Sequence, residues 1–264
     1  MTTDRTPLLE FDNTTVVLKD KRVLDSISFR IDVGENVAII GPNGSGKSAL
    51  IKTITREYYP LAQNGHQPVR ILGQDTWNIF DLRSLLGIVS SDLQQTCARY
   101  FTGWEMVLSG FFGSVGIWPN HEVTERMESK ARAILEFLEI SHLADKNMVE
   151  MSTGEARRVL IGRALVHGPK ALMLDEPMNG LDPHAARRFG NSLRKIAGAG
   201  KSIIMVTHHL QDIIPEIGRV IMISDGRLFR DGNKEEVLTE ENLSELFRMP
   251  VEISRRNGYY HLWG

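Results

Sequence analysis

Eight consecutive residues match GxxxxGK followed by Ser or Thr, a loop pattern that binds phosphate groups: Gly41, Pro42, Asn43, Gly44, Ser45, Gly46, Lys47 and Ser48. Glycines allow backbone N–H groups to converge on phosphate oxygens, and a helix that begins here adds partial positive charge. Lys47 can reach the β- and γ-phosphates, and the Ser48 hydroxyl can bind Mg²⁺. With Ala49 in the following turn, the pattern predicts a nucleoside triphosphate site.

Two elements must position this loop. The apolar residues 37–40 precede it, and residues 50–58 carry apolar side chains at helical spacing. A glycine-rich turn that binds nothing is the alternative. It does not explain why the motif occurs between a buried strand and a helix, which is the context that phosphate binding requires.

A second pair of chemically competent residues ends the segment KALMLDEP at residues 170–177. This apolar strand delivers Asp175 and Glu176 at its carboxyl end, where ligands bind in a parallel sheet. Asp175 can hold Mg²⁺, and Glu176 can polarise an attacking water molecule. An isolated Asp-Glu pair is more often a solvated strand end, but together with the phosphate loop it indicates a hydrolytic site.

The strands that support these residues are visible as apolar patterns. Residues 8–33 are typical of β-structure, most clearly where Ile27, Phe29, Ile31 and Val33 alternate with other residues. Short apolar runs follow at 69–72, 86–89, 171–174, 203–206 and 220–223. Helical stretches separate several of these runs, so the sequence indicates an α/β fold with a mainly parallel sheet. Asp225-Gly226 predicts a hairpin turn.

Residues 92–155 interrupt this alternation, because apolar side chains there lie on one helical face and no strand run occurs. We predict a helical insertion at 92–155, with 1–91 and 156–264 forming the core of a single domain over 1–264. Helices are also expected at about 154–167 and from Asp182-Pro183, where a capping residue precedes proline.

Composition limits the remaining function classes. The 264 residues are 42% hydrophobic, enough for a substantial core, and the net charge of -2 provides no field that attracts nucleic acid, which we do not expect as a partner. Cys97 is the single cysteine, so an intramolecular disulfide is excluded. Without a signal peptide or a run of about 18 apolar residues, we expect a cytosolic chain that does not itself span a membrane.

Along essentially its whole length, the chain resembles the nucleotide-binding subunit of ATP-binding cassette (ABC) proteins. Residues 151–155, MSTGE, are similar to the LSGGQ signature of that family, residues 179–182 to its D-loop, and Val206-Thr207-His208 to its switch-histidine segment. The resemblance implies a P-loop NTPase with a RecA-like, mainly parallel sheet core, an N-terminal antiparallel β-subdomain and a helical insertion subdomain. It also implies ATP and Mg²⁺ as cofactors, and ATP hydrolysis.

The resemblance further implies that two copies of the chain enclose the nucleotide. Ser152, Gly154 and Glu155 of one copy would then face the γ-phosphate bound by the other copy. The resemblance also implies that His208 contacts the γ-phosphate and orients the attacking water. Asp182 would help to join the copies, and a local role as a helix cap remains equally open for it.

Four positions depart from the family pattern. Leu18 stands where the family has an aromatic residue that stacks on adenine, so about 0.5–1.5 kcal/mol of stacking is missing. Ser91 stands in place of a glutamine that binds Mg²⁺. Gln94 is the preferred substitute for that ligand, Gln95 is close by, and an exposed glutamine pair is an equal alternative. Thr153 and Glu155 replace glycine and glutamine in the signature.

The resemblance implies work on a partner, and we expect a bacterial importer with separate integral membrane permease subunits and a substrate-binding protein. The chain would lie on the cytoplasmic face of the membrane. The C-terminal segment resembles iron-chelate and vitamin importers, and VSSDLQQ resembles molybdate-related cassettes. Alternatives are a soluble ABC ATPase that acts on ribosomes or DNA, and a dimerisation module without turnover.

Six aromatic residues within 100–118 could line a permease-binding groove or form a local core: Tyr100, Phe101, Trp104, Phe111, Phe112 and Trp118.

Overall fold

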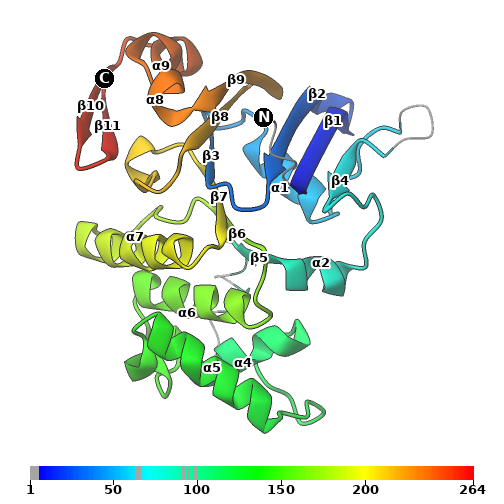
Figure 1. Ribbon diagram of the computed structural model, residues 1–264, viewed down its shortest axis with the longest axis vertical. Coiled ribbons are helices and arrows are strands. Elements are labelled where there is room, and N and C mark those ends of the chain that lie inside the picture. Colours follow the sequence, from blue (N-terminus) through cyan, green and yellow to red (C-terminus); the bar gives the residue numbers. More distant parts are fainter. Residues whose placement is uncertain (1–5, 63–66, 91–92, 94–95, 98–99) are drawn as a thin grey trace. The chain divides into compact units, whose positions relative to one another are not determined.

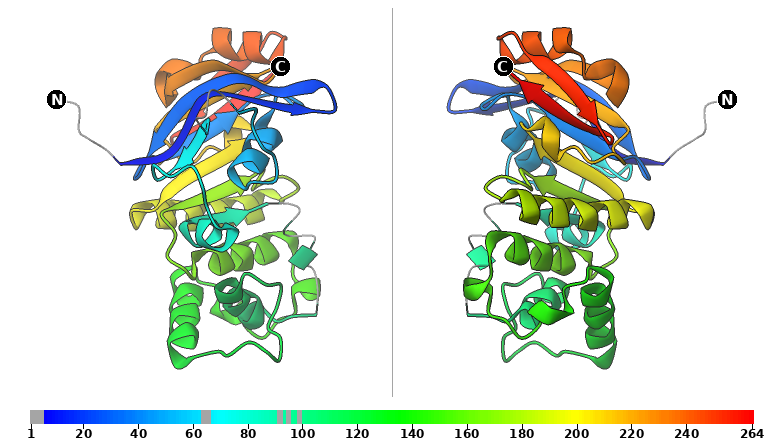
Figure 2. Two further views of the ribbon diagram at one scale, coloured as in Figure 1. Left: turned by 90° about the vertical axis from the view of Figure 1, so that its right-hand side faces the viewer. Right: turned by 90° about the vertical axis from the view of Figure 1, so that its left-hand side faces the viewer.

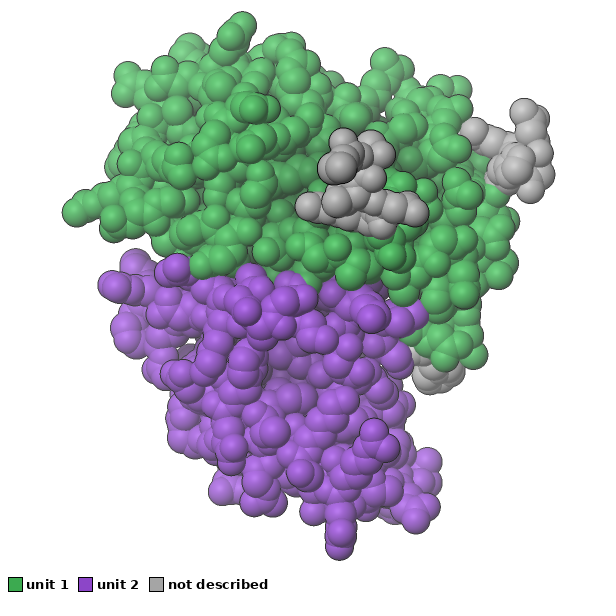
Figure 3. All heavy atoms as spheres, in the orientation of Figure 1, with its two compact units in different colours: residues 1–82, 202–264 green, residues 83–201 purple. Residues whose placement is uncertain are grey.

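The computed structural model describes residues 6–62, 67–90, 93, 96–97 and 100–264 (Figure 1). They form two compact units, one of Met1–Leu82 with Ser202–Gly264 and one of Arg83–Lys201 (Figure 3). The predicted insertion at 92–155 lies within the second unit, together with two strands and two long helices that flank it in sequence.

An antiparallel sheet forms the N-terminal part of the first unit. Strand β1 (Pro7–Leu18) lies between β2 (Lys21–Asp32) and β4 (Val69–Ile71). Phe11 of β1 is opposite Phe29 of β2, and their rings stack with centroids 4.8 Å apart. The strands expected within 8–33 and 69–72 are therefore present, because alternating side chains bury one face of this sheet.

A mainly parallel sheet supports the phosphate loop in the same unit. Strand β3 (Val37–Ile40) lies between β7 (Ser202–Thr207) and β8 (Arg219–Ser224), and both pairings are parallel. Every residue of β3 and β7 is buried, which explains why these strands are nearly continuous apolar runs. Strand β9 (Arg227–Asn233) joins antiparallel through the predicted turn, where Asp225 and Gly226 have φ angles of 49° and 76°.

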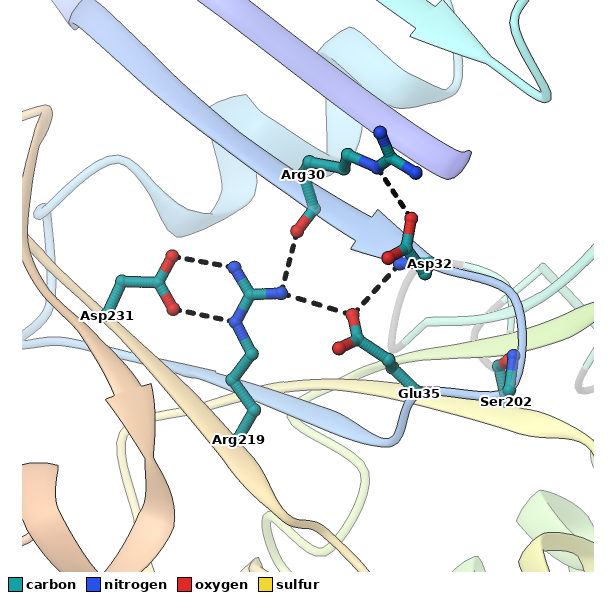
Figure 4. Close-up of polar contacts among 7 residues, drawn as sticks. Arg30, Asp32, Glu35, Ser202, Arg219 and Asp231 are labelled. Carbon is teal, nitrogen blue, oxygen red and sulfur yellow. Dashed lines mark hydrogen bonds and ion pairs between the residues drawn. The ribbon is translucent and has the colours of Figure 1, made fainter. Parts of the chain in front are cut away.

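An ion-pair network fixes the entry of the chain into β3 (Figure 4). Arg219 donates two hydrogen bonds of 2.7 Å to the carboxylate of Asp231 and a third, of 3.1 Å, to Glu35. Its guanidinium also donates to the carbonyl of Arg30 at 2.7 Å, and Glu35 accepts from the N–H of Asp32. The bidentate contact with Asp231 raises the pKa of Arg219 above its usual value. The network thus ties the end of β2 and the following turn to β8 and β9.

The first unit also contains α1 (Lys47–Ile54) and, towards the C-terminus, η4 (Leu210–Asp212), α8 (Lys234–Val237) and α9 (Glu240–Phe247). A terminal hairpin follows, formed by β10 (Glu252–Arg256) and β11 (Tyr259–Trp263), and β11 packs on η4 (Figure 2). The sequence did not predict this hairpin, because β10 is mostly charged and exposed and lacks an apolar alternation.

In the second unit, β5 (Leu86–Val89) pairs in parallel with β6 (Ala171–Asp175), and the short helix α2 (Ile79–Leu85) leads into β5. The helices are α4 (Gly103–Ser109), α5 (Glu125–Phe137), α6 (Thr153–Leu165) and α7 (Pro183–Gly198), with single turns η1 (Gly110–Phe112), η2 (Ser141–Leu143) and η3 (Met148–Glu150). Helices α4, α5 and α6 pack on one another, and α7 packs on α6 (Figure 1).

Helix α5 carries the apolar face expected from the sequence, since Ala131, Leu135 and the capping residue Leu138 are buried. Over the part of the chain that the structure describes, no helix combines the length and the apolar character needed to cross a bilayer.

Candidate active site

The phosphate loop connects the end of β3 to the first residue of α1. Within it, Gly44 and Gly46 have φ angles of 79° and 110°, which a residue with a Cβ atom rarely adopts. A Cβ atom on Gly41 would lie 2.2 Å from the carbonyl oxygen of Ile223, so that position has no room for a side chain. The N–H of Gly226 donates to the carbonyl of Ser45 at 2.8 Å, which fixes the loop against the β8–β9 turn.

Lys47 spans this loop. It is buried, and its Nζ donates to the carbonyl oxygens of Gly41 at 2.7 Å and Pro42 at 3.0 Å. These two hydrogen bonds hold the ammonium group against the backbone of Gly41 and Pro42 at the start of the loop. The charge is therefore placed by the loop itself, as the motif predicts.

The residues of the loop fit a triphosphate. No side chain caps the N-terminus of α1 and no acidic residue lies in its first turn, so the positive end of the helix is directed at the loop. The Ser45 Oγ is buried without a hydrogen-bond partner among the described residues, and its chemistry suits a phosphate oxygen. The glycines leave the backbone bare where a ligand must approach closely.

Replacing Gly46 by alanine should be far more damaging than replacing Gly44. Both residues have left-handed backbones, which cost a side chain roughly 1–2 kcal/mol. A Cβ atom on Gly46 would also meet the Val23 carbonyl oxygen at 2.8 Å, whereas one on Gly44 meets nothing within 4 Å. We expect Gly46→Ala to lower the unfolding free energy by roughly 2–5 kcal/mol and Gly44→Ala by roughly 1–2. Urea denaturation measures both, and equal losses would contradict the crowding at Gly46.

The acidic pair stands at the end of β6, as the sequence predicts. Asp175 is the last residue of the strand, and Glu176 has a left-handed φ of 47°. A non-glycine residue in this region carries strain on the order of 1–3 kcal/mol, and such strain is concentrated at functional sites. The carbonyl of Glu176 accepts a hydrogen bond of 3.2 Å from the N–H of Asn179, which closes the turn after the pair.

The signature segment forms the start of α6. The Ser152 hydroxyl accepts from the N–H of Glu155 at 3.3 Å, and the Glu155 carboxylate accepts from the N–H of Ser152 at 2.8 Å, which is a capping box. Burial by itself raises the pKa of Glu155, but hydrogen bonds from Lys146 and Ser152 outweigh it and hold the pKa below its usual value. Ser152 therefore caps helix α6, and both Ser152 and Thr153 are exposed at the N-terminus of that helix.

The D-loop residues lead directly into α7. Asp182 caps this helix by accepting hydrogen bonds of 2.9 and 3.0 Å from the N–H groups of His184 and Ala185. The bond from Ala185 holds the pKa of Asp182 below its usual value. A Cβ atom on Gly154 would lie 2.9 Å from the Cβ of Ala185, so the signature glycine permits close packing of α6 on α7.

His208 follows the last residue of β7. Thr207 donates through its hydroxyl to the carboxylate of Asp212 at 2.7 Å, and the N–H of His209 donates to the Thr207 hydroxyl at 3.0 Å. The rings of His208 and His209 lie 3.8 Å apart between centroids. The buried Thr207–Asp212 pair thus fixes the end of β7, which His208 directly follows.

The remaining predicted ligands are distributed as follows. Ser48 is exposed in the first turn of α1 in the first unit, and Asp175 ends β6 in the second unit; a hydroxyl and a carboxylate each offer an oxygen of the kind that suits Mg²⁺. Within the described residues no cluster of three or more His, Cys, Asp or Glu side chains that could hold a metal ion occurs. Leu18 ends β1, whereas Ser91 and Gln94 lie outside the described residues.

Comparison with known proteins identifies the family of the chain. The family model for ABC transporters matches residues 24–179. The chain is 32% identical to the uncharacterized ABC transporter ATP-binding protein YlmA of Bacillus subtilis, over 93% of both chains. It resembles the crystal structure of MJ1267, an ATP-binding cassette of an ABC transporter in its ADP conformation, with a TM-score of 0.79, 29% identity and coverage of 92% of this chain and 98% of that one.

A further neighbour carries the products of hydrolysis. The dimeric, post-hydrolysis structure of the cassette MJ0796, bound to ADP and Pi, matches with a TM-score of 0.69 and 25% identity, over 85% of this chain and 98% of that chain.

Relatives of both transport directions also match. The hemin import protein HmuV of Hahella chejuensis is 29% identical over 90% of this chain and 92% of its own length. A Nod factor export protein of Sinorhizobium fredii is 32% identical over 88% of this chain and 65% of its own length.

Because the family model matches residues 24–179, a relative is 32% identical over 93% of the chain, and solved ATP-binding cassettes share its fold, the chain belongs to the ABC transporter family as an ATP-binding subunit with the α/β fold of the P-loop NTPases, and it hydrolyses ATP.

Proposed function

We propose that this chain powers a bacterial ABC importer by ATP-driven dimerisation on the cytoplasmic face of the membrane. Two copies would enclose two ATP molecules, and each site would combine the phosphate loop of one copy with the signature of the other. Separate integral membrane permease subunits would bind the dimer, and a substrate-binding protein would deliver the cargo.

The observation that carries the dimer proposal is the exposed N-terminus of helix α6, where the signature residues lie. Its N-terminus carries partial positive charge, and the exposed Ser152 and Thr153 lie at that end. The capping box satisfies local backbone groups but leaves the Ser152 hydroxyl at the surface, where a phosphate held by another copy could reach it. The dimeric post-hydrolysis structure of the similar cassette MJ0796 supports the proposal that two copies associate.

Within such a site, each residue has a distinct task. Lys47 and the loop amides would bind the β- and γ-phosphates, and Ser48 and Asp175 would hold Mg²⁺. The ion supplies charge neutralisation between the phosphates. Glu176 would accept a hydrogen bond from the attacking water and polarise it, and His208 would donate to the γ-phosphate. Glutamine at position 94 stays a proposed further ligand of the ion.

The helical part of the second unit is the proposed contact with the permease. Tyr100 and Trp118 are 86% and 46% exposed. Other aromatic residues of the same segment are used internally, since Phe101 packs edge-on against Trp118 and Phe112 stacks on His121. These rings thus contact neighbouring rings without being buried, and the exposed Tyr100 and Trp118 could receive a helix of another protein.

The hemin import protein, which is 29% identical over 90% of this chain, supports the proposal of import. Export is the second candidate, because the Nod factor export protein is 32% identical over 88% of this chain.

Affinity purification of the tagged chain from membranes of its native cells tests this function. We expect an integral membrane permease in the complex and faster ATP hydrolysis once both are reconstituted in lipid vesicles. A Tyr100→Ser variant should lose the permease yet keep the basal ATPase rate, because the ring is exposed and distant in sequence from the nucleotide motifs. Recovery with ribosomes or DNA and without a permease would instead favour the soluble class of ABC ATPases.

A further inference from the structure

Arg157 is a buried arginine on the signature helix that the sequence did not single out. It lies two residues after Glu155 in α6 and is 7% exposed. Its Nη1 donates a hydrogen bond of 2.8 Å to the carbonyl oxygen of Pro177. Both residues belong to the second compact unit. A charged donor placed in a buried site makes a strong hydrogen bond, because water competes little for the carbonyl.

Pro177 directly follows the strained Glu176. The Glu176 carbonyl is held by the N–H of Asn179, and the Pro177 carbonyl is held by Arg157. The two peptide groups after the carboxylate are therefore both anchored, and Pro177 itself is buried. A left-handed φ persists only when surrounding contacts maintain it, so these anchors are the means by which the turn retains its shape.

The adjacent Arg158 has the same chemistry and a different destination. It is 6% exposed, and its guanidinium donates to the carbonyl of Leu138 at 2.6 Å and to the hydroxyl of Ser192 at 3.3 Å. It therefore joins α6 to the end of α5 and to α7, and none of these contacts involves the acidic pair. The chain thus provides a matched comparison, with two buried arginines on one helix of which one reaches the turn after Glu176.

We propose that Arg157 is a positioning residue for ATP hydrolysis, which acts by holding the Glu176 turn in the conformation that presents the carboxylate to the attacking water. This inference rests on the catalytic role proposed for Glu176. The signature residue Ser152 caps the N-terminus of the same helix. Through Arg157, α6 therefore connects the signature to the turn after Glu176 within a single chain.

Steady-state kinetics of the full chain with Mg²⁺ and ATP test the proposal. Arg157→Met removes the donor and keeps much of the apolar stem, and we expect kcat to fall about tenfold while KM for ATP changes by less than about twofold. Arg157→Lys should recover kcat to within about threefold of the wild-type value, because an ammonium group can donate to the same carbonyl. Arg157→Leu, which also lacks a donor, replaces the methionine variant if that variant does not fold.

Arg158→Met is the control for the loss of a buried charge. It should lower the melting temperature about as much as Arg157→Met and leave kcat within about twofold of wild type. Equal kcat losses in both variants, an unchanged kcat in Arg157→Met, or a loss confined to KM would overturn the proposal.

A Glu176→Gln variant measured alongside separates the positioning role of Arg157 from the catalytic role of Glu176. Normal turnover by Glu176→Gln removes the basis of the inference, whereas its inactivity beside a fully active Arg157→Met rejects Arg157 alone.

Discussion

Glu176→Gln should abolish ATP hydrolysis and trap an ATP-bound dimer. Glutamine has nearly the same shape as glutamate but cannot take up a proton from the attacking water, and removal of such a group costs on the order of 10²–10⁴-fold in rate. ATP binding should survive, since the phosphate loop is unchanged in this variant. Phosphate release measures the first effect, and light scattering of the variant with ATP and Mg²⁺ measures the second as a mass twice that of one chain.

A matched control is Glu241→Gln, which removes one exposed carboxylate in the first turn of α9. We expect its turnover to equal that of the unaltered chain and its mass with ATP to show no trapped dimer. Normal hydrolysis by Glu176→Gln would rule out Glu176 as the catalytic residue. An inactive variant that stays monomeric with ATP would retain the catalytic role and contradict the ATP-driven dimer.

Lys47→Ala should remove ATP binding at concentrations that saturate the unaltered chain. The ammonium group contributes the one full positive charge of the motif, and its Nζ also holds the carbonyls of Gly41 and Pro42. Loss of a charge-assisted contact of about 1.5–3 kcal/mol weakens binding by roughly 10–150-fold, and the disturbed loop adds to that loss. Isothermal titration with ATP measures the affinity directly.

Lys52→Ala is the control for this variant. Lys52 lies in the last turn of the same helix and has its Nζ over the ring of Tyr58, 5.4 Å from the centroid. We expect the control to bind ATP within about twofold of the unaltered chain. If Lys47→Ala binds as well as Lys52→Ala, the phosphate-binding role of Lys47 is wrong.

Much of the fold could be predicted because its signals are local. The strands β3, β7 and β8 are short apolar runs, and a strand buried on both faces needs that pattern wherever it lies in the sheet. The turn at Asp225-Gly226 and the cap at Asp182 were also predicted correctly, since φ preference and hydrogen bonding to nearby N–H groups depend on adjacent residues alone.

The contacts that hold the site in place could not be predicted in this way. Gly46 is crowded by the carbonyl of Val23 and by Gly226, residues that are far away in the sequence. The left-handed backbone of Glu176 could not be predicted, because the residues around it form the ordinary pattern of an apolar strand and its end. The adjacent Arg157 and Arg158 are alike in sequence and in burial, and only their separate partners in the folded chain distinguish them.

By itself the sequence determined that the chain has a triphosphate loop at 41–48, an acidic pair after a buried strand, and an α/β arrangement around them. Composition and spacing suffice for this, because backbone conformation, periodicity and charge are properties of short segments. Only the tertiary structure decided how the loop is crowded against β8 and its turn, and which arginine of α6 anchors the turn after Glu176. These depend on packing between segments distant in sequence, which no local pattern encodes.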